Sequence, residues 1–350
     1  MSKIISIVSG KGGCGKSLFT AILGRTLARE GQNVLMVDMD IFVRGLTILL
    51  KSFKKSSSIE DKLSMTDIMM KISKNDICYE NLMIERFYEC DILLSVANIG
   101  APFSNKTNKI NSGFSSHERI KKLFEVIKDK YDYILIDNRA GVDNLIYESS
   151  MNSDIILSIA EDDEISRQTN SNLINFFKFG KYKRENVYTI INKARNVSNF
   201  EDVTKKSSEK PEYSYIGVIP FDMEILNRFG SERFWYTVNE TLYFRALIEC
   251  WNNLKSFENI DEISLSKYHF PPQIFMRKSQ GRFYMIERMM IVYSIIFIIG
   301  GIGIWIYKQY DYGNFSRYDI MSIFLIVLGA FTFILSVSNF FTKIIKRKNE

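Results

Sequence analysis

Residues 3–17 read KIISIVSGKGGCGKS, and this stretch decides the fold. Its first seven residues, Lys3 to Ser9, form a short apolar run rich in β-branched side chains, which is typical of a buried strand. Four glycines follow at once, at positions 10, 12, 13 and 15, and from Ser17 to Glu30 apolar residues recur with helical spacing. The stretch therefore predicts a strand, a glycine-rich loop and a helix in direct succession.

The same alternation continues toward residue 255. Further apolar runs of strand length occur at 33–37, 91–97, 133–136, 154–160, 187–191 and 215–219, and helix-like stretches such as 118–130 and 165–179 lie between most of them. Alternating strands and helices are typical of an α/β fold with a mainly parallel sheet and helices on both faces. We expect one such domain over residues 1–255.

The net charge of +6 comes from the C-terminal end of the chain. From Arg277 to Glu350 there are ten Lys or Arg against four Asp or Glu, which leaves 36 of each sign in the preceding 276 residues. Broad DNA-binding faces need clustered positive charge to neutralise phosphates. The balanced charge of the first 276 residues therefore argues against a specific nucleic-acid partner.

Two long apolar runs lie in the C-terminal region, at 289–307 and 320–341, and neither contains a charged residue. At about 1.5 Å per residue each is long enough to cross a hydrocarbon core of about 30 Å. We expect a transmembrane hairpin over 289–341, a juxtamembrane linker over 256–288 and a basic cytoplasmic tail over 342–350. Lys and Arg flank the pair, and few lie between the runs. The positive-inside rule then predicts a multi-pass protein of the cell inner membrane with both termini cytoplasmic.

The glycine-rich loop has the composition of a phosphate-binding site. It consists of Gly10, Lys11, Gly12, Gly13, Cys14, Gly15, Lys16 and Ser17. Glycines allow backbone N–H groups to converge on phosphate oxygens, and the following helix adds the positive end of its dipole. Lys16 is placed to reach the β and γ phosphates, and Ser17 offers a hydroxyl to Mg²⁺. Cys14 is most simply a small residue that fits; a redox role is the alternative.

Three acidic residues follow predicted strands. Asp38 and Asp40 come at the end of the apolar run 33–37, and Asp137 ends the run 133–136. Ligands of open α/β sheets bind at this carboxyl edge. Asp137 therefore reads as a Walker B residue that would hold a Mg²⁺-bound water.

The extra lysine, Lys11, makes the loop resemble the deviant Walker A motif of the MinD/ParA family of P-loop ATPases. This resemblance implies ATP as the nucleotide and a homodimer in which Lys11 reaches the nucleotide of the partner. It also implies that Asp40 positions the attacking water and that Asp38, with Ser17 and Asp137, supports the Mg²⁺ shell. Arg139 stands where the family has proline, and its guanidinium could lie near the phosphates or outside them.

Two further segments are similar to the parts of that family that flank the adenine. Asn192 follows the apolar run 187–191, and Pro220 follows the run 215–219. By the resemblance, Asn192 would bond the edge of the base and the Pro220 loop would cover its face. Each is a common strand-end sequence by itself, and together they extend the resemblance over roughly residues 1–250.

The resemblance implies an ATPase that uses Lys11, Lys16 and Asp40 for catalysis and ATP with Mg²⁺ as cofactors. With the expected hairpin, it would dimerise on ATP to position or recruit an unidentified protein partner at the lipid bilayer. Two alternatives stay open from the sequence. One is a membrane effector of a defence or stress system gated by nucleotide state, and the other is a tyrosine kinase of the polysaccharide-export type.

Overall fold

A computed structural model describes residues 2–51, 62–70, 77–96, 115–179, 185–194, 214–229, 231, 233–268 and 270, and in the C-terminal region 293–302, 304, 306, 323–328 and 330. The chain divides into two compact units, Met1–Phe270 and Pro271–Glu350. The domain ranges expected from the sequence stay a prediction.

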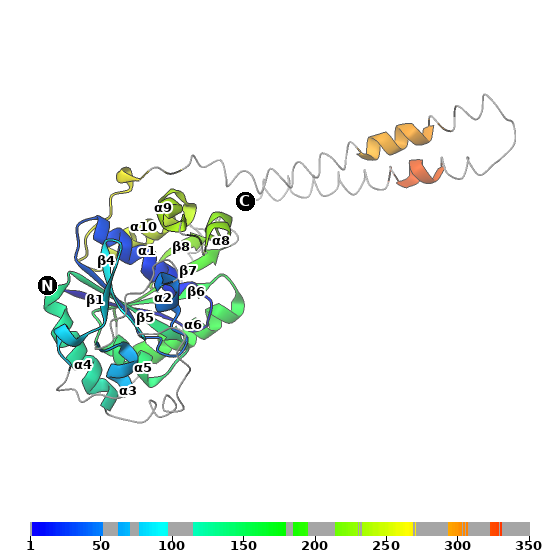
Figure 1. The fold of residues 1–350 in the computed structure, drawn as a ribbon. Helices are drawn as coiled ribbons and strands as arrows, with labels where there is room; N and C mark the ends of the chain where they lie inside the picture. Colours follow the sequence, from blue (N-terminus) through cyan, green and yellow to red (C-terminus); the bar gives the residue numbers. More distant parts are fainter. Residues whose placement is uncertain are drawn as a thin grey trace. The chain divides into compact units, whose positions relative to one another are not determined.

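The first unit is built on an eight-stranded sheet with the strand order β3-β4-β2-β5-β1-β6-β7-β8 (Figure 1). The strands are β1 (Lys3–Ser9), β2 (Val34–Asp38), β3 (Ile84–Phe87), β4 (Cys90–Leu93), β5 (Tyr133–Ala140), β6 (Ile155–Glu161), β7 (Val187–Ala194) and β8 (Ser214–Pro220). All neighbouring pairs are parallel except β3 and β4. The carboxyl ends of seven strands therefore meet at one edge of the sheet.

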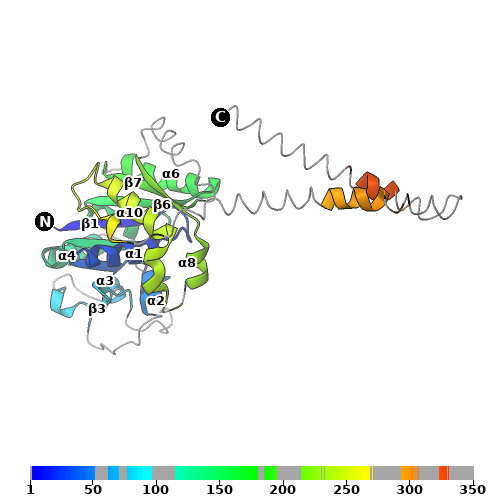
Figure 2. The ribbon, with the colours of Figure 1, turned by 90° about the horizontal axis from the view of Figure 1, so that it is seen from above.

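Helices cover both faces of this sheet (Figure 2). The helices are α1 (Lys16–Arg29), α2 (Gly45–Lys51), α3 (Met65–Met70), α4 (Ser115–Ile127), α5 (Asn144–Met151), α6 (Glu164–Phe179), α8 (Met223–Arg228), α9 (Phe234–Thr237) and α10 (Leu242–Leu254). Short 3-10 helices lie at η2 (Tyr79–Asn81), η4 (Lys128–Lys130), η6 (Val238–Glu240) and η7 (Leu265–Lys267).

Alternation along the strands divides the core between the two faces. In β1, Ile5 and Ile7 pack with α1 and α10, whereas Ile4 packs with α3 and α4 and Val8 with α5 and α6. This is the period of two that a strand buried on both faces requires. The sequence prediction of a mainly parallel sheet with helices on both faces is confirmed. The edge strand β3 was not expected.

Residues after α10 also pack on the first unit. Ile260 and Ile263 are buried in the same cluster as α1 and α10. The indole Nε1 of Trp251 donates to the carbonyl of Asp261 at 2.8 Å, and the hydroxyl of Tyr133 donates to Oδ2 of Asp261 at 3.0 Å. The first unit thus continues past residue 255.

The expected multi-pass location in the inner membrane is corrected by the structure. Within the described residues, no helix has both the length and the apolar character needed to cross a membrane. The described helical residues of the second unit are 293–302, 304, 306, 323–328 and 330. The remainder of the runs 289–307 and 320–341, and the tail 342–350, lie outside the described residues.

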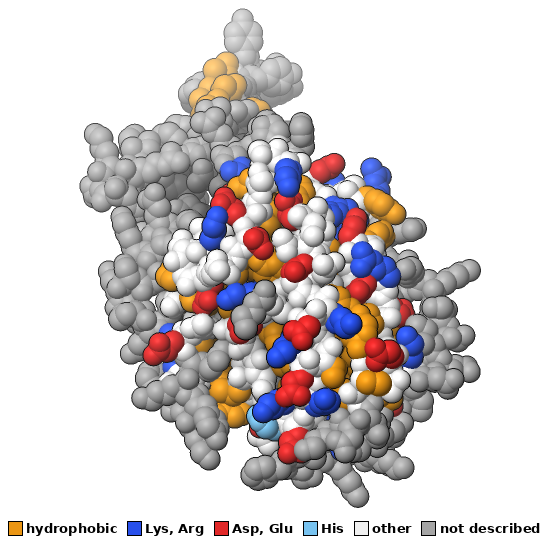
Figure 3. Space-filling view, turned by 90° about the vertical axis from the view of Figure 1, so that its left-hand side faces the viewer, with side chains coloured by type: hydrophobic (Ala, Val, Ile, Leu, Met, Phe, Trp, Pro, Cys, Tyr) orange, Lys and Arg blue, Asp and Glu red, His pale blue; other side chains and the backbone are white. Residues whose placement is uncertain are grey.

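Charges of both signs are interspersed on the face drawn in Figure 3. Lys and Arg side chains there alternate with Asp and Glu, and neither sign gathers into a field of its own. This arrangement agrees with the balanced charge of the first 276 residues.

Candidate functional site

The loop between β1 and α1 has the backbone shape that only glycine adopts easily. Gly13 and Gly15 have positive φ angles of 83° and 90°. A Cβ on Gly10 would lie 2.4 Å from the backbone of Thr169 in α6, so this position has no room for a side chain. Gly15 begins α1 without a side-chain cap. The N–H groups of such a helix start are the donors that phosphates bind.

Lys16 carries a buried positive charge at the start of α1. Its side chain is 8 % exposed, and its Nζ donates to Oγ of Ser9 at 3.0 Å. Within the described residues, one of its three N–H donors has a hydrogen-bond partner, so the other two can bind oxygens of a phosphate in the loop.

Two carboxylates lie side by side where β2 ends next to β5. The strand register pairs Asp38 with Asp137, and both side chains are buried. Burial raises the pKa of both carboxyl groups, and the negative charge of Asp137 raises the pKa of Asp38 further. The nearby Lys16 and Ser17 partly offset the rise at Asp137. The site therefore holds more negative charge than its surroundings neutralise.

The two carboxylates differ in their hydrogen bonds. Asp38 accepts from the backbone N–H of Asp40 at 3.1 Å and of Thr47 at 2.7 Å, so it fixes the loop between β2 and α2. Neither carboxylate oxygen of Asp137 accepts a hydrogen bond of standard geometry from the described residues, although the Lys16 ammonium and the Ser17 hydroxyl lie close enough to lower its pKa. An unpartnered buried carboxylate is costly, and a cation in contact with it would remove that cost.

These residues fit Mg²⁺ bound through a nucleotide. The described residues contain no cluster of three or more His, Cys, Asp or Glu side chains suited to hold a metal ion. Mg²⁺ is commonly bound by one or two protein oxygens together with phosphate oxygens and water. Asp137 and the hydroxyl of Ser17, which is near enough to lower the pKa of Asp137, are such a pair. Asp38 supports the loop beside them and does not offer a free oxygen pair.

Asp40 lies in the loop that follows β2. Its Oδ1 accepts from the backbone N–H of Val43 at 2.9 Å, and its carbonyl accepts from the N–H of Arg44 at 2.7 Å. The side chain is thus held in a tight turn at the carboxyl edge of the sheet. This is the edge that also carries the glycine loop.

Lys11 is held by carboxylates of its own chain. Its Nζ lies 3.2 Å from Oε2 of Glu161 and 3.1 Å from Oδ2 of Asp163. Hydrogen bonds to Asp163 and then to Glu161 raise the pKa of Lys11. The ammonium stays fully charged and is directed to the end of β6, where Glu161 and Asp163 lie.

The residues expected at the adenine brace the loop in this structure. Nδ2 of Asn192 donates to the carbonyl of Cys14 at 2.7 Å. The neighbouring Lys193 donates from Nζ to the carbonyl of Gly13 and to Oε1 of Glu161, each at 2.5 Å. Asn192 thus reaches the glycine loop from β7 and contacts the backbone of the loop, whereas its bond to the adenine edge stays a prediction.

Pro220 ends β8 and stands beside Ala194 at the end of β7. The next residue, Phe221, donates its N–H to the carbonyl of Ala194 at 2.9 Å, and its ring is exposed. Asp222 then caps α8 by accepting from the N–H of Glu224 at 2.9 Å. The Pro220 segment therefore lies at the same edge of the sheet as Asn192.

Three charged residues at this edge were not predicted from the sequence. They are Glu161, Asp163 and Lys193, and together with Lys11 they form one connected group of ion pairs. Glu161 and Asp163 lie about 150 residues from Lys11 along the chain. A strand that ends in an acidic residue, as β6 does, was the one local signal for them.

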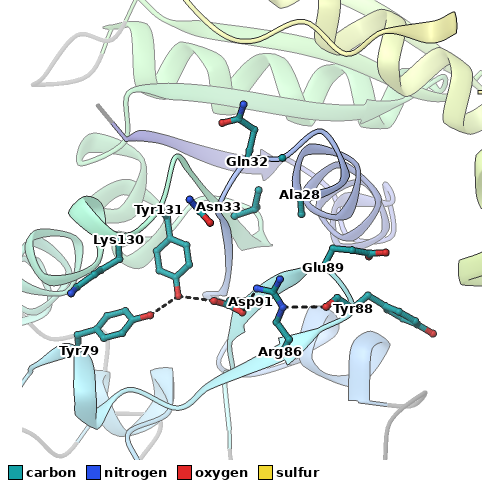
Figure 4. A pocket seen from close by; sticks show the side chains of 12 residues that line it. Ala28, Gln32, Asn33, Tyr79, Arg86, Tyr88, Glu89, Asp91, Lys130 and Tyr131 are labelled. Carbon is teal, nitrogen blue, oxygen red and sulfur yellow. Dashed lines mark hydrogen bonds and ion pairs between the residues drawn. The ribbon is translucent and has the colours of Figure 1, made fainter. Parts of the chain in front are cut away.

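A pocket of about 490 Å³ lies at the opposite, amino-terminal ends of β2, β4 and β5 (Figure 4). The Tyr131 hydroxyl lies 2.8 Å from the hydroxyl of Tyr79 and donates to Oδ2 of Asp91 at 3.0 Å. Arg86 pairs with Oδ1 of the same carboxylate at 2.9 Å. None of the site residues expected from the sequence lines this pocket, so it is separate from the glycine loop.

Comparison with known proteins matches the region that contains these residues. A family model described as an AAA domain matches residues 2–194. The septum site-determining protein MinD of Helicobacter pylori is 26 % identical over 235 residues, which is 65 % of this chain and 81 % of that protein. MinD of Synechocystis is 33 % identical over 144 residues, 41 % of this chain, and the match spans about half (47 %) of the length of that protein.

The fold of the first unit is also similar to that of a solved structure. The septum site-determining protein MinD from Pyrococcus horikoshii, complexed with Mg-ADP, superimposes with a TM-score of 0.55 at 23 % sequence identity. The alignment covers 73 % of this chain and 97 % of that protein.

Proposed function

We propose an ATP-driven switch for this chain, which belongs to the AAA-domain family and, within it, to the P-loop ATPases of the MinD/ParA type. In this proposal the first unit binds ATP with Mg²⁺ on the loop 10–17 and hydrolyses it there. The ATP-bound form dimerises, and the dimer recruits a protein partner.

The observation that carries the proposal is the pair of buried charged groups beside the glycine loop whose hydrogen-bonding capacity the described residues leave largely unused. Lys16 has one hydroxyl partner, and both oxygens of Asp137 lack a partner among the described residues. A Mg²⁺–nucleotide complex offers oxyanions to the first and a cation to the second. When bound, Mg²⁺ would neutralise charge on the phosphates.

In this proposal, different residues bind the phosphates, hold the metal and position the attacking water. The glycine loop and Lys16 bind the phosphates, and Ser17 with Asp137 holds the metal. Asp40 orients the attacking water from the loop after β2, and Asp38 keeps that loop in place through the N–H groups of Asp40 and Thr47. Catalysis of this kind is mainly positioning and charge neutralisation.

Apolar side chains around the glycine loop support a dimer over this edge. Val43, Val142 and Ile165 are 69 %, 50 % and 70 % exposed, and they lie in the segments that follow β2, β5 and β6. Exposed apolar side chains gathered at one edge favour contact with another protein surface. Lys11 lies at the same edge, where it would reach the nucleotide of the second copy.

The test is phosphate release and nucleotide binding by the full chain and a Lys16→Ala variant. We expect Mg²⁺-dependent ATP hydrolysis in the wild type and a rate lower by at least about a hundredfold in Lys16→Ala, because one charged donor to the phosphates is lost. Lys255→Ala, which removes an exposed lysine at the end of α10, is the matched control and should keep the wild-type rate. The proposal fails if the wild type shows no Mg²⁺-dependent affinity for ATP.

A further inference from the structure

Arg139 occupies the position at which this chain departs from the family motif, directly after Asp137 and Asn138. Its guanidinium carbon lies 4.8 Å from the centre of the Phe42 ring. One of its terminal nitrogens lies 3.1 Å from Oδ2 of Asp143. Both contacts are to residues outside the glycine loop, so in this structure the guanidinium is engaged by protein groups.

Phe42 belongs to the loop that carries Asp40. This loop turns tightly, because the N–H groups of Val43 and Arg44 both bond to Asp40. Phe42 is partly buried and packs against the cluster that contains Met39 and Ile41. A group that holds the Phe42 ring therefore restrains the backbone that positions the Asp40 carboxylate.

Asp143 fixes the other side of Arg139. It is the N-cap of α5, and its Oδ1 accepts from the N–H of Ile146 at 2.9 Å. Its Oδ2 remains for Arg139. Because α5 packs on the sheet, Asp143 anchors the guanidinium to a rigid element, and the guanidinium in turn covers the ring of Phe42.

We propose that Arg139 is a positioning residue that clasps the Asp40 loop to the segment after β5. It acts through Phe42 and Asp143 and does not contact the phosphates. The inference rests on the proposed function in one respect, namely that the loop it restrains carries the water-orienting Asp40. A planar guanidinium suits this place because it can cover an aromatic ring with its face and donate to a carboxylate with its edge.

The first arm of the test measures, in the absence of nucleotide, whether Arg139 restrains the Asp40 loop. In Arg139→Ala and Phe42→Leu, we expect the amides of Val43 and Arg44 to exchange hydrogen about two- to fivefold faster than in the wild type. The reason is that the loop loses the contact between the guanidinium and the aromatic ring. Arg245→Ala is the matched control. Arg245 lies 5.7 Å from the ring of Phe270, pairs with Glu249 four residues on, and is 34 % exposed, against 35 % for Arg139.

The second arm separates positioning from phosphate binding. We expect Arg139→Ala to lower kcat by about tenfold or more while the Kd for ATP changes by less than about twofold, because a displaced water-orienting group affects the reaction and not the binding of substrate. The double variant Phe42→Leu, Arg139→Ala should lose no more than Arg139→Ala alone, since the two residues act as one unit. Arg139→Lys should recover little.

Two results would overturn the inference. Unchanged amide exchange at Val43 and Arg44 in Arg139→Ala would show that there is no clasp. A Kd for ATP that rises as much as kcat falls would show that the guanidinium binds phosphate. A wild type that does not hydrolyse ATP would count against the proposed function, and the exchange arm would still decide on the clasp.

Discussion

At the scale of single residues, the most telling contact is that of Lys11 with Glu161 and Asp163 of its own chain. A lysine that is to reach the nucleotide of a second copy must first leave these carboxylates. The pair is partly exposed, and exposed ion pairs are weak. In the proposed dimer, the contact would therefore oppose dimerisation only weakly.

We predict that Asp163→Asn lowers the ATP concentration at which half of the protein is dimeric, by about two- to fivefold, because one of the two carboxylates that hold Lys11 is lost. The asparagine keeps an oxygen that can accept from the N–H of Ser166, as Asp163 does at 2.8 Å. Light scattering after size exclusion, over a range of ATP concentrations, measures the shift. Glu164→Gln, one residue further on, is the control and should leave the midpoint unchanged.

Lys11→Ala should stay monomeric at every ATP concentration in the same experiment. If it dimerises like the wild type, Lys11 has no part in the dimer, and the interpretation of its ion pairs is wrong.

At the scale of elements, the parallel register of β2 and β5 brings Asp38 and Asp137 together. With a different register between β2 and β5, these two carboxylates would not lie side by side. The pairing concentrates charge at one point of the sheet edge, and it raises the pKa of both groups by burial and, at Asp38, by repulsion from Asp137. The two buried carboxylates thus lower the stability of the folded chain, and a bound cation would offset this loss.

We predict that, with Mg²⁺ chelated, the free energy of unfolding falls as the pH rises above the usual carboxyl range and levels off beyond the raised pKa values. The sign follows from proton binding. The folded chain keeps protons that the unfolded chain, with ordinary carboxyl groups, has already released, so a rise in pH favours unfolding. Urea unfolding from about pH 5 to about pH 8 measures this dependence.

Asp137→Asn should flatten this pH dependence and raise the stability of the chelated protein near neutral pH, because the variant buries no second charge. Asp129→Asn, at an exposed position before β5, is the control and should follow the wild-type curve. A wild-type curve that rises over this pH range would contradict the assignment of raised pKa values.

Elements whose signals are local in the sequence could be predicted, and those that depend on distant partners could not. The strand, glycine loop and helix of 3–30 follow from adjacent residues, as does the acid that follows the apolar run 133–136. β3 was missed because Ile84–Phe87 has only four residues, two of them charged, and it becomes a strand by pairing with β4. The bond from Asn192 to Cys14 depends on two strand ends that only the sheet order brings together.

At the scale of the whole molecule, the boundary of the first unit depends on the residues after α10. Ile260 and Ile263 are buried, and Asp261 bonds to both Trp251 and Tyr133. The sequence of 256–270 did not predict this, because its apolar residues are spread among polar ones and their burial depends on the surface that α10 and β5 provide.

We predict that a chain ending at residue 255 is less stable than one ending at Phe270 by about 3 kcal/mol or more, since it leaves out two buried isoleucines at about 1.5–3 kcal/mol each. Urea unfolding of the two truncated chains, followed by far-UV circular dichroism, gives the difference. Equal midpoints would mean that the packing of 256–270 contributes nothing to the first unit.

The multi-pass location expected from the apolar runs 289–307 and 320–341 is a different case. It is wrong for the part of the chain that the structure describes, since no helix there has both the length and the apolar character needed to cross a membrane.

Gly10 has one further consequence. Its missing side chain lets the backbone of α6 rest directly on the loop, and the segment leading into α6 carries the Asp163 that binds Lys11. The loop and the helix are therefore in direct contact. A protein that bound the outer surface of α6 and displaced this helix would also displace the loop that binds phosphate in the proposed function, without touching the nucleotide.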